Sequence, residues 1–87
     1  MTRQPNYAVP TGEFIWEWID DNDVPAAELA TRLGVTHEYI LELLSGKAAL
    51  TANLAMALES VTGIPADHWN RLEALYQADL IRLAKLG

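Results

Sequence analysis

The stretch AAELATRLGVTHEYILELLS, residues 26–45, decides the fold of this chain. Ala30 falls where two helices cross too closely for a larger side chain, and Gly34 follows Leu33 at a point where a left-handed backbone ends a helix. After this glycine, apolar residues recur at the i, i+3 and i+4 spacing of one buried helical face, at Ile40, Leu43 and Leu44. The stretch therefore predicts two short helices joined by one sharp turn, the second over residues 35–43.

Two helices joined in this way form a helix-turn-helix motif, whose second helix normally enters the major groove of DNA. The match rests on Leu29, Ala30, Leu33, Gly34, Val35, Ile40 and Leu43. A threonine caps the second helix, and the exposed first turn of that helix then carries Thr36, His37, Glu38 and Tyr39. Glutamate can accept a hydrogen bond from cytosine N4, and threonine can contact base edges or a thymine methyl group. We therefore expect these four residues to read bases.

Four further residues are expected near DNA: Glu42, Lys47, Thr51 and Asn53. Lys47 follows the second motif helix, where it acts either as a phosphate clamp or as a solvated loop lysine. Asn53 lies beside the free backbone N–H groups of a helix that Thr51 caps, where a phosphate can approach. Phosphates would repel Glu38 and Glu42. For Glu38 the alternative role is a favourable charge near a helix N-terminus, which contributes about 0.3–1 kcal/mol.

Beyond this motif, the chain resembles the HigA-like antitoxins of the XRE repressor family over residues 6–76. The resemblance is carried by residues 10–15, the Gly46-Lys47 turn, Thr51, residues 63–66 and Trp69. It implies an all-α fold, namely a five-helix XRE or phage-repressor-like helix-turn-helix domain. It also implies a protein that represses its own operon and neutralises a ribonuclease toxin.

One departure from that family concerns the start of the first motif helix. The family commonly places a Ser-Gln pair there, and the Gln approaches the DNA backbone. Here the pair is Pro25-Ala26, so this phosphate contact is absent. The proline itself suits a first helical turn, because its missing N–H would have no partner there.

The chain divides into an N-terminal arm, residues 1–10, and a helix-turn-helix domain, residues 11–87. The arm contains two prolines and no apolar period, so we expect no regular structure in it. Thr11 is expected to cap the first helix, whose apolar stripe consists of Phe14, Ile15, Trp18 and Ile19. Trp16 lies about 100° or more off this stripe. It either marks a contact surface or rests half-buried against a neighbouring loop.

The last two helices are predicted from caps and apolar spacing. Thr51 caps the fourth helix, which ends at Gly63 and carries the stripe Leu54, Ala55, Leu58 and Val61. Pro65 begins the fifth helix, whose apolar pattern continues past the length needed to close a five-helix domain. We expect a second copy or another partner to cover the excess, and we assign a homodimer interface to Trp69, Leu72, Tyr76, Leu80 and Leu83. A dimer would set the spacing of two DNA half-sites at about 34 Å.

The net charge of −6 is unusual for a DNA-binding domain, because such domains gain affinity by neutralising phosphates. Residues 11–45 carry eight acidic residues against Arg32 alone, a net charge of −7. This charge, together with Pro25-Ala26, favours an alternative function. In that alternative the same fold is an acidic protein-interaction module, an antitoxin or anti-regulator that binds a basic partner, with weak or lost DNA binding.

Several kinds of chemistry have no candidate residues in the sequence. There is no cysteine, and His37 and His68 belong to no recognised metal-ligand spacing, so we expect no metal, no cofactor and no catalytic site. No apolar run approaches the roughly 18 residues that span a membrane. We therefore expect a cytoplasmic protein that is not an enzyme.

The leading prediction is a helix-turn-helix transcriptional regulator that binds double-stranded operator DNA as a homodimer, with its third helix in the major groove. A protein toxin is a second expected partner. The acidic interaction module remains the alternative.

Overall fold

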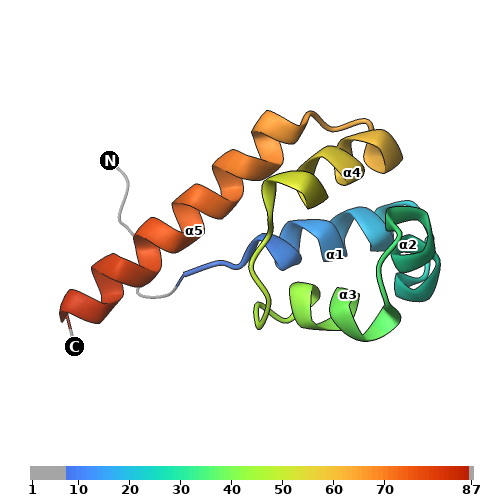
Figure 1. Ribbon diagram of the computed structural model, residues 1–87. Helices are drawn as coiled ribbons and strands as arrows, with labels where there is room; N and C mark the ends of the chain where they lie inside the picture. The colour runs from blue at the N-terminus through green and yellow to red at the C-terminus, as the bar shows by residue number, and fades with distance from the viewer. Residues whose placement is uncertain (1–7, 87) are drawn as a thin grey trace.

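The computed structural model describes residues 8–86, which form five α-helices and contain no strand (Figure 1). The helices are α1 (Thr11–Asp21), α2 (Ala26–Leu33), α3 (His37–Leu44), α4 (Ala52–Thr62) and α5 (Ala66–Leu86). The predicted all-α, five-helix architecture is confirmed. Residues 1–7 of the expected arm lie outside the described residues, and residues 8–10 have no regular structure.

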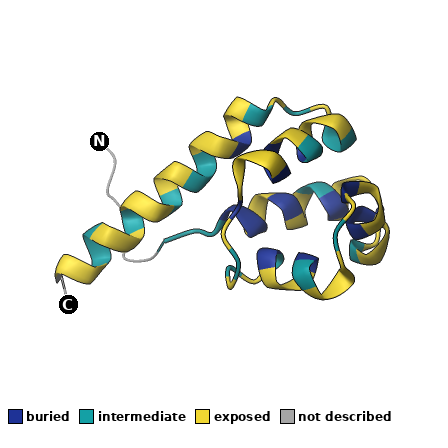
Figure 2. Cartoon of the chain, viewed as in Figure 1, coloured by how far each residue is buried: buried dark blue, intermediate teal, exposed yellow. Residues whose placement is uncertain are grey.

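The core lies among α1 to α4 and the first turn of α5. The buried apolar residues are Ile15, Ile19, Val24, Leu29, Ala30, Leu33, Ile40, Leu43, Leu50, Leu54, Ala55, Leu58 and Trp69. Figure 2 shows this burial on the first four helices and at the start of α5, whereas the rest of α5 extends away and is exposed or half-buried. The described part of the molecule is accordingly elongated, at 39 × 26 × 23 Å.

The turn between α2 and α3 has the predicted geometry. Gly34 adopts the left-handed conformation with φ of 76°, and the N–H of Val35 donates to the carbonyl of Ala30 over 2.9 Å. The hydroxyl of Thr36 accepts from the N–H of Tyr39 over 3.0 Å and so caps α3. These local hydrogen bonds satisfy backbone groups that the ends of two helices leave free.

Four helix starts differ from the prediction: α3 begins at His37 and not at residue 35, and α5 begins at Ala66 and not at Pro65. The other two are the starts of α1 and α2. Pro10, not Thr11, occupies the N-cap position of α1, and the buried Thr11 hydroxyl instead donates to Glu73 Oε1 of α5 over 2.8 Å. A carboxylate from a distant helix has replaced the backbone N–H as the partner of this hydroxyl. Pro25 is the N-cap of α2 and not its first helical residue, with an extended ψ of 150°.

The position of Trp69 corrects one expected interface residue. Its side chain is 1% exposed and lies in the core, because the first turns of α5 close the core over α1 and α4. A residue buried within its own protomer offers no surface to a second copy. Trp69 therefore does not belong to a dimer surface, and it stabilises the fold of the protomer instead.

Candidate nucleic-acid interface

The exposed side of α3 is the element that a helix-turn-helix presents to DNA. Ile40 and Leu43 anchor the opposite side of α3 in the core, with 0% and 1% exposure. Five residues of α3 and its N-cap are exposed: the polar Thr36, His37, Glu38 and Glu42, and Leu41, which is 48% exposed. Tyr39 is half-buried, and its hydroxyl lies 3.5 Å from the carbonyl oxygen of Ala49 in the loop before α4. Burial of one side thus fixes which residues the other side displays.

Four of the eight predicted DNA-contacting residues meet in one groove. It has a volume of about 480 Å³ and is lined by Leu33, Val35, Thr36, Tyr39, Thr51, Asn53, Leu54 and Ala57. The groove brings together the N-terminal ends of α3 and α4. The hydroxyl of Thr51 accepts from the N–H of Leu54 over 3.1 Å, so each of these two helices begins with a threonine cap. Backbone N–H groups of the first turns, which have no partner within their helix, also lie at these ends.

The other four predicted residues lie outside this groove. His37, Glu38 and Glu42 are on α3, and Lys47 is in the turn that follows it. Lys47 is exposed, and its backbone N–H donates to the carbonyl of Glu42 over 2.8 Å. An eight-residue helix is about 12 Å long, so Lys47 and Thr36 stand at opposite ends of α3. A ligand that touches both must lie along the whole helix.

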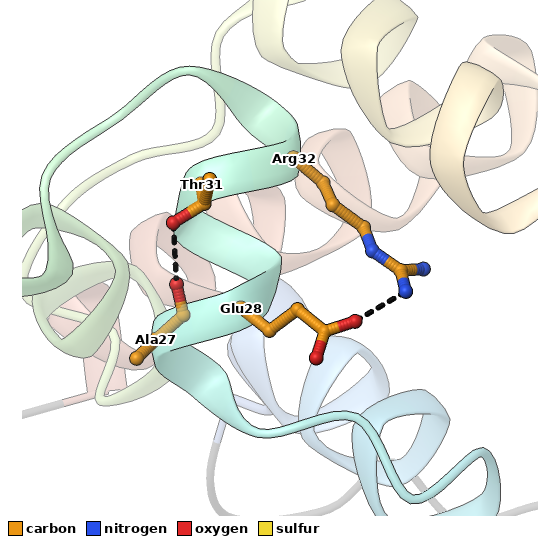
Figure 3. A network of polar contacts seen from close by, with 4 residues as sticks. All are labelled: Ala27, Glu28, Thr31 and Arg32. Atoms are coloured by element: carbon orange, nitrogen blue, oxygen red, sulfur yellow. Dashed lines mark hydrogen bonds and ion pairs between the residues drawn. The ribbon is translucent and has the colours of Figure 1, made fainter.

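The cation of α2 is already paired within its own helix. Figure 3 shows the ion pair between the Arg32 guanidinium and the carboxylate of Glu28, one turn earlier in the helix. It also shows the hydrogen bond that the Thr31 hydroxyl donates to the carbonyl of Ala27. Both charged side chains are 47% exposed, so the pair contributes little to stability. Its effect is on the surface charge, because Glu28 offsets the single positive charge of residues 11–45. Lys47 is the nearest cation after it in the chain.

Sequence reasoning missed the residue that sets the position of α3 against α1. A Cβ on Gly12 would stand 2.7 Å from Leu44 Cα and closer still to the carbonyl oxygen of Leu43. Only glycine allows α1 and α3 to approach so closely. The sequence does contain a signal for this contact, namely a glycine in the first turn of a predicted helix. Alanine is the better helix former, so a glycine there indicates a close approach of another backbone.

The described residues contain no group of three or more side chains that could hold a metal ion. Over the same residues, no helix is long and apolar enough to cross a membrane.

Comparisons with known proteins agree with this geometry. The sequence matches the helix-turn-helix family HTH_3 over residues 20–69. It is 33% identical to the uncharacterized HTH-type transcriptional regulator YddM of Escherichia coli (strain K12), over 97% of this chain and 96% of that protein.

Two solved structures share the fold. A candidate antidote protein of a plasmid maintenance system from Nostoc punctiforme superposes with a TM-score of 0.85 at 25% identity, covering 91% of this chain and 87% of that one. The antitoxin HigA of Pseudomonas aeruginosa, solved with the higBA promoter, gives a TM-score of 0.84 at 22% identity, covering 88% and 85%.

Proposed function

The chain belongs to the helix-turn-helix family of DNA-binding regulators, and we propose that it represses transcription as a homodimer on operator DNA, with α3 in the major groove. The observation that carries this proposal is the α2–α3 unit, in which the left-handed Gly34 and the capping Thr36 hold α3 with its polar side outward. A helix held in this way needs no rearrangement before it enters a groove.

The base-reading residues in this proposal are the exposed Thr36, His37, Glu38 and Glu42, together with the half-buried Tyr39. A carboxylate is the acceptor that suits cytosine N4, and a threonine methyl suits thymine. Glu38 and Glu42 therefore favour operator positions with cytosine on the contacted strand. They also lower the affinity for every sequence, because both carboxylates lie near phosphates.

Phosphate contacts in this proposal come from Lys47, Thr51 and Asn53. Asn53 and Thr51 stand at the N-terminus of α4, where unpaired N–H groups and the helix dipole favour an anion. Lys47 supplies a full positive charge at the other end of α3. Groups suited to binding the DNA backbone thus lie near both ends of α3.

The dimer in this proposal forms through the C-terminal half of α5. Leu72 and Tyr76 continue the stripe of Trp69 and are half-buried within the protomer, and Tyr76 Oη would lie 3.6 Å from a Cβ on Gly46. The same stripe continues to Leu80, which is 40% exposed, and to the half-buried Leu83, beyond the end of the core. An apolar stripe that extends beyond the core of its own protomer is suited to pack against the same stripe of a second copy related by a two-fold axis.

We further propose an antitoxin role, in which a protein toxin is the second partner. The support is the similarity of the whole described fold to a solved HigA antitoxin and to a candidate plasmid-maintenance antidote. In this role the protein acts in the cytoplasm, where its DNA is, and it carries out no catalysis and needs no cofactor.

A second candidate function is the acidic interaction module, with weak or lost DNA binding. Three features favour it: the net charge of −7 over residues 11–45, the pairing of Arg32 with Glu28, and Pro25 in place of a phosphate-contacting start of α2. Each of these lowers the positive potential that DNA binding needs.

Fluorescence anisotropy on the DNA upstream of the protein's own gene separates the two functions. The titration is run at about 50 mM and about 200 mM salt, because phosphate-driven affinity falls steeply over this range. The regulator predicts specific binding that exceeds binding to a scrambled duplex at both salt concentrations. Equal binding to both duplexes, or none at about 50 mM salt, would overturn the regulator, and a pull-down that retains a basic partner would then establish the interaction module.

A further inference from the structure

A second groove lies on α1 and the turn to α2, and none of its residues belongs to α3 or α4. It has a volume of about 260 Å³ and is lined by Trp16, Ile19, Asp20, Asp23, Val24 and Pro25. Pockets for small-molecule ligands usually measure about 300–1,000 Å³. The smaller size of this groove suits a single inserted side chain.

The apolar part of the groove combines a covered floor with an exposed aromatic ring. Ile19 and Val24 are 6% and 9% exposed, so they form a fixed base. Trp16 is 53% exposed, the largest exposed aromatic side chain among the described residues. Tryptophan is enriched at positions that dominate binding energy in protein interfaces. A half-exposed indole beside an apolar floor is therefore a suitable anchor for a partner side chain.

The polar part of the groove is negatively charged. Asp20 and Asp23 have no ion pair or side-chain hydrogen bond among the described residues, and no basic residue lines the groove. The turn that carries Asp23 is held by a hydrogen bond from the N–H of Val24 to the carbonyl of Ile19 over 3.1 Å. The complementary cation must therefore come from outside the described chain.

We propose that this groove recognises an arginine side chain presented by a basic protein partner. A guanidinium stacks on an indole face through its planar surface and donates to carboxylates at its edge, so it satisfies both parts of the groove at once. The α1 helix and the turn after it carry five acidic residues and no basic one, a charge that attracts a basic protein to this side of the molecule. The groove and the α3 surface share no residue, so either proposal can fail without the other.

The direct test is a nuclear magnetic resonance titration of the intact 87-residue protein with the peptide acetyl-Ala-Gly-Arg-Gly-Ala-amide at constant ionic strength. The control peptide carries citrulline, the neutral isostere of arginine, at the central position. We expect the arginine peptide to shift the Trp16 indole signal and the backbone amides of Asp23 and Val24. The citrulline peptide should leave these signals in place.

Variants then assign the binding to the groove. The double variant Asp20→Asn, Asp23→Asn should weaken binding about threefold to tenfold, and Trp16→Leu about twofold to fivefold. Asparagine tolerates the left-handed backbone of residue 23, whose φ is 54°, so the turn should keep its shape. The matched control Glu13→Gln, Asp67→Asn removes the same two charges elsewhere and should leave the affinity unchanged.

Four results would overturn the proposal. Citrulline binding as well as arginine would mean that the charge is not recognised. Equal weakening by the control variant, or shifts spread evenly over all acidic residues, would mean diffuse attraction without a groove. Unchanged groove signals at saturating peptide would mean that arginine does not enter it.

Discussion

Gly12 illustrates how a single residue fixes the position of α3. The α1 backbone at Gly12 lies against the α3 backbone at Leu43 and Leu44, with no room for a methyl group. The obstacle is backbone, which cannot rotate away as a side chain can. Any substitution must therefore move α3 as a whole.

The expected result for Gly12→Ala is a loss of about 1–3 kcal/mol of stability and a displaced α3. Thermal and urea melts measure the stability, and chemical shifts of the α3 amides report the displacement. Gly34→Ala is the control, because a Cβ there meets open space and only the left-handed backbone, with φ of 76°, is penalised. If Gly12→Ala melts no earlier than Gly34→Ala, the close approach of the two helices is wrong.

Ala30 limits the space at a second helix crossing. Its side chain is 2% exposed, and it lies on α2, which packs against both α3 and α4. Ala30→Leu adds three carbons to this contact and should cost about 1–3 kcal/mol or more, a large share of the stability of a small domain. A melting temperature within one degree of the wild type would contradict the packing.

Two exposed residues of opposite charge test the DNA contact of α3. Glu38→Gln should tighten binding to non-specific DNA by removing a repelled carboxylate, and Lys47→Ala should weaken it and reduce the salt slope by about one unit. Both side chains are exposed, so neither substitution should alter folding. Anisotropy titrations at several salt concentrations measure both effects. No change in either variant would mean that α3 does not face DNA.

At the scale of elements, α5 has two halves with different roles. The stripe that buries Trp69 in the core continues, at the i, i+4 and i+7 spacing, through Tyr76, Leu80 and Leu83. The first half of α5 has a core to cover, but the second half extends beyond it (Figure 1). Among the described residues, the second half of this stripe therefore has no core to cover, as the proposed dimer requires.

Leu80→Asp, Leu83→Asp should convert the proposed dimer to a monomer with little loss of helicity, because a charged pair in a two-fold apolar contact is left without a partner. Sedimentation velocity measures the mass and circular dichroism the helicity. Ala78→Asp adds charge to an exposed position away from the stripe and should leave the dimer intact. A wild-type protein that stays monomeric at high concentration would exclude the two-fold operator arrangement.

At the scale of the whole molecule, affinity for DNA should depend on two protomers acting together, since each acidic protomer alone has few phosphate contacts to offer. A full operator with half-sites about 34 Å apart should be bound far more tightly than a single half-site. The Leu80→Asp, Leu83→Asp variant should bind both duplexes equally weakly. Anisotropy on the two duplexes measures the ratio, and equal wild-type affinities would mean that the protomers bind independently.

The α3 side and the α1–α2 side of the molecule are suited to different partners. The α3 side carries Glu38 and Glu42, with Lys47 in the turn after the helix, whereas the α1–α2 side carries Asp20 and Asp23, which have no ion pair among the described residues and line a groove with Trp16. DNA and a basic protein would therefore approach different sides, and a partner on α1 need not displace DNA directly.

The sequence by itself determined the features that depend on neighbours within a few residues. Gly34 and Gly63 end helices in the left-handed conformation, and Thr36 and Thr51 cap the helices that follow them, as their positions predict. Such caps are closed by hydrogen bonds to residues three positions away, so a local pattern is enough to identify them. The same holds for the buried spacing of α2, α3 and α4.

Only the tertiary structure decided how distant helices meet. Whether Trp69 fills a core or an interface depends on where α5 docks, and the partner of Thr11 is Glu73, sixty-two positions away. The closeness of Gly12 to α3 likewise depends on a helix crossing. Apolar spacing shows that a helix has a buried face but does not identify what covers it, because the covering residues come from remote parts of the chain.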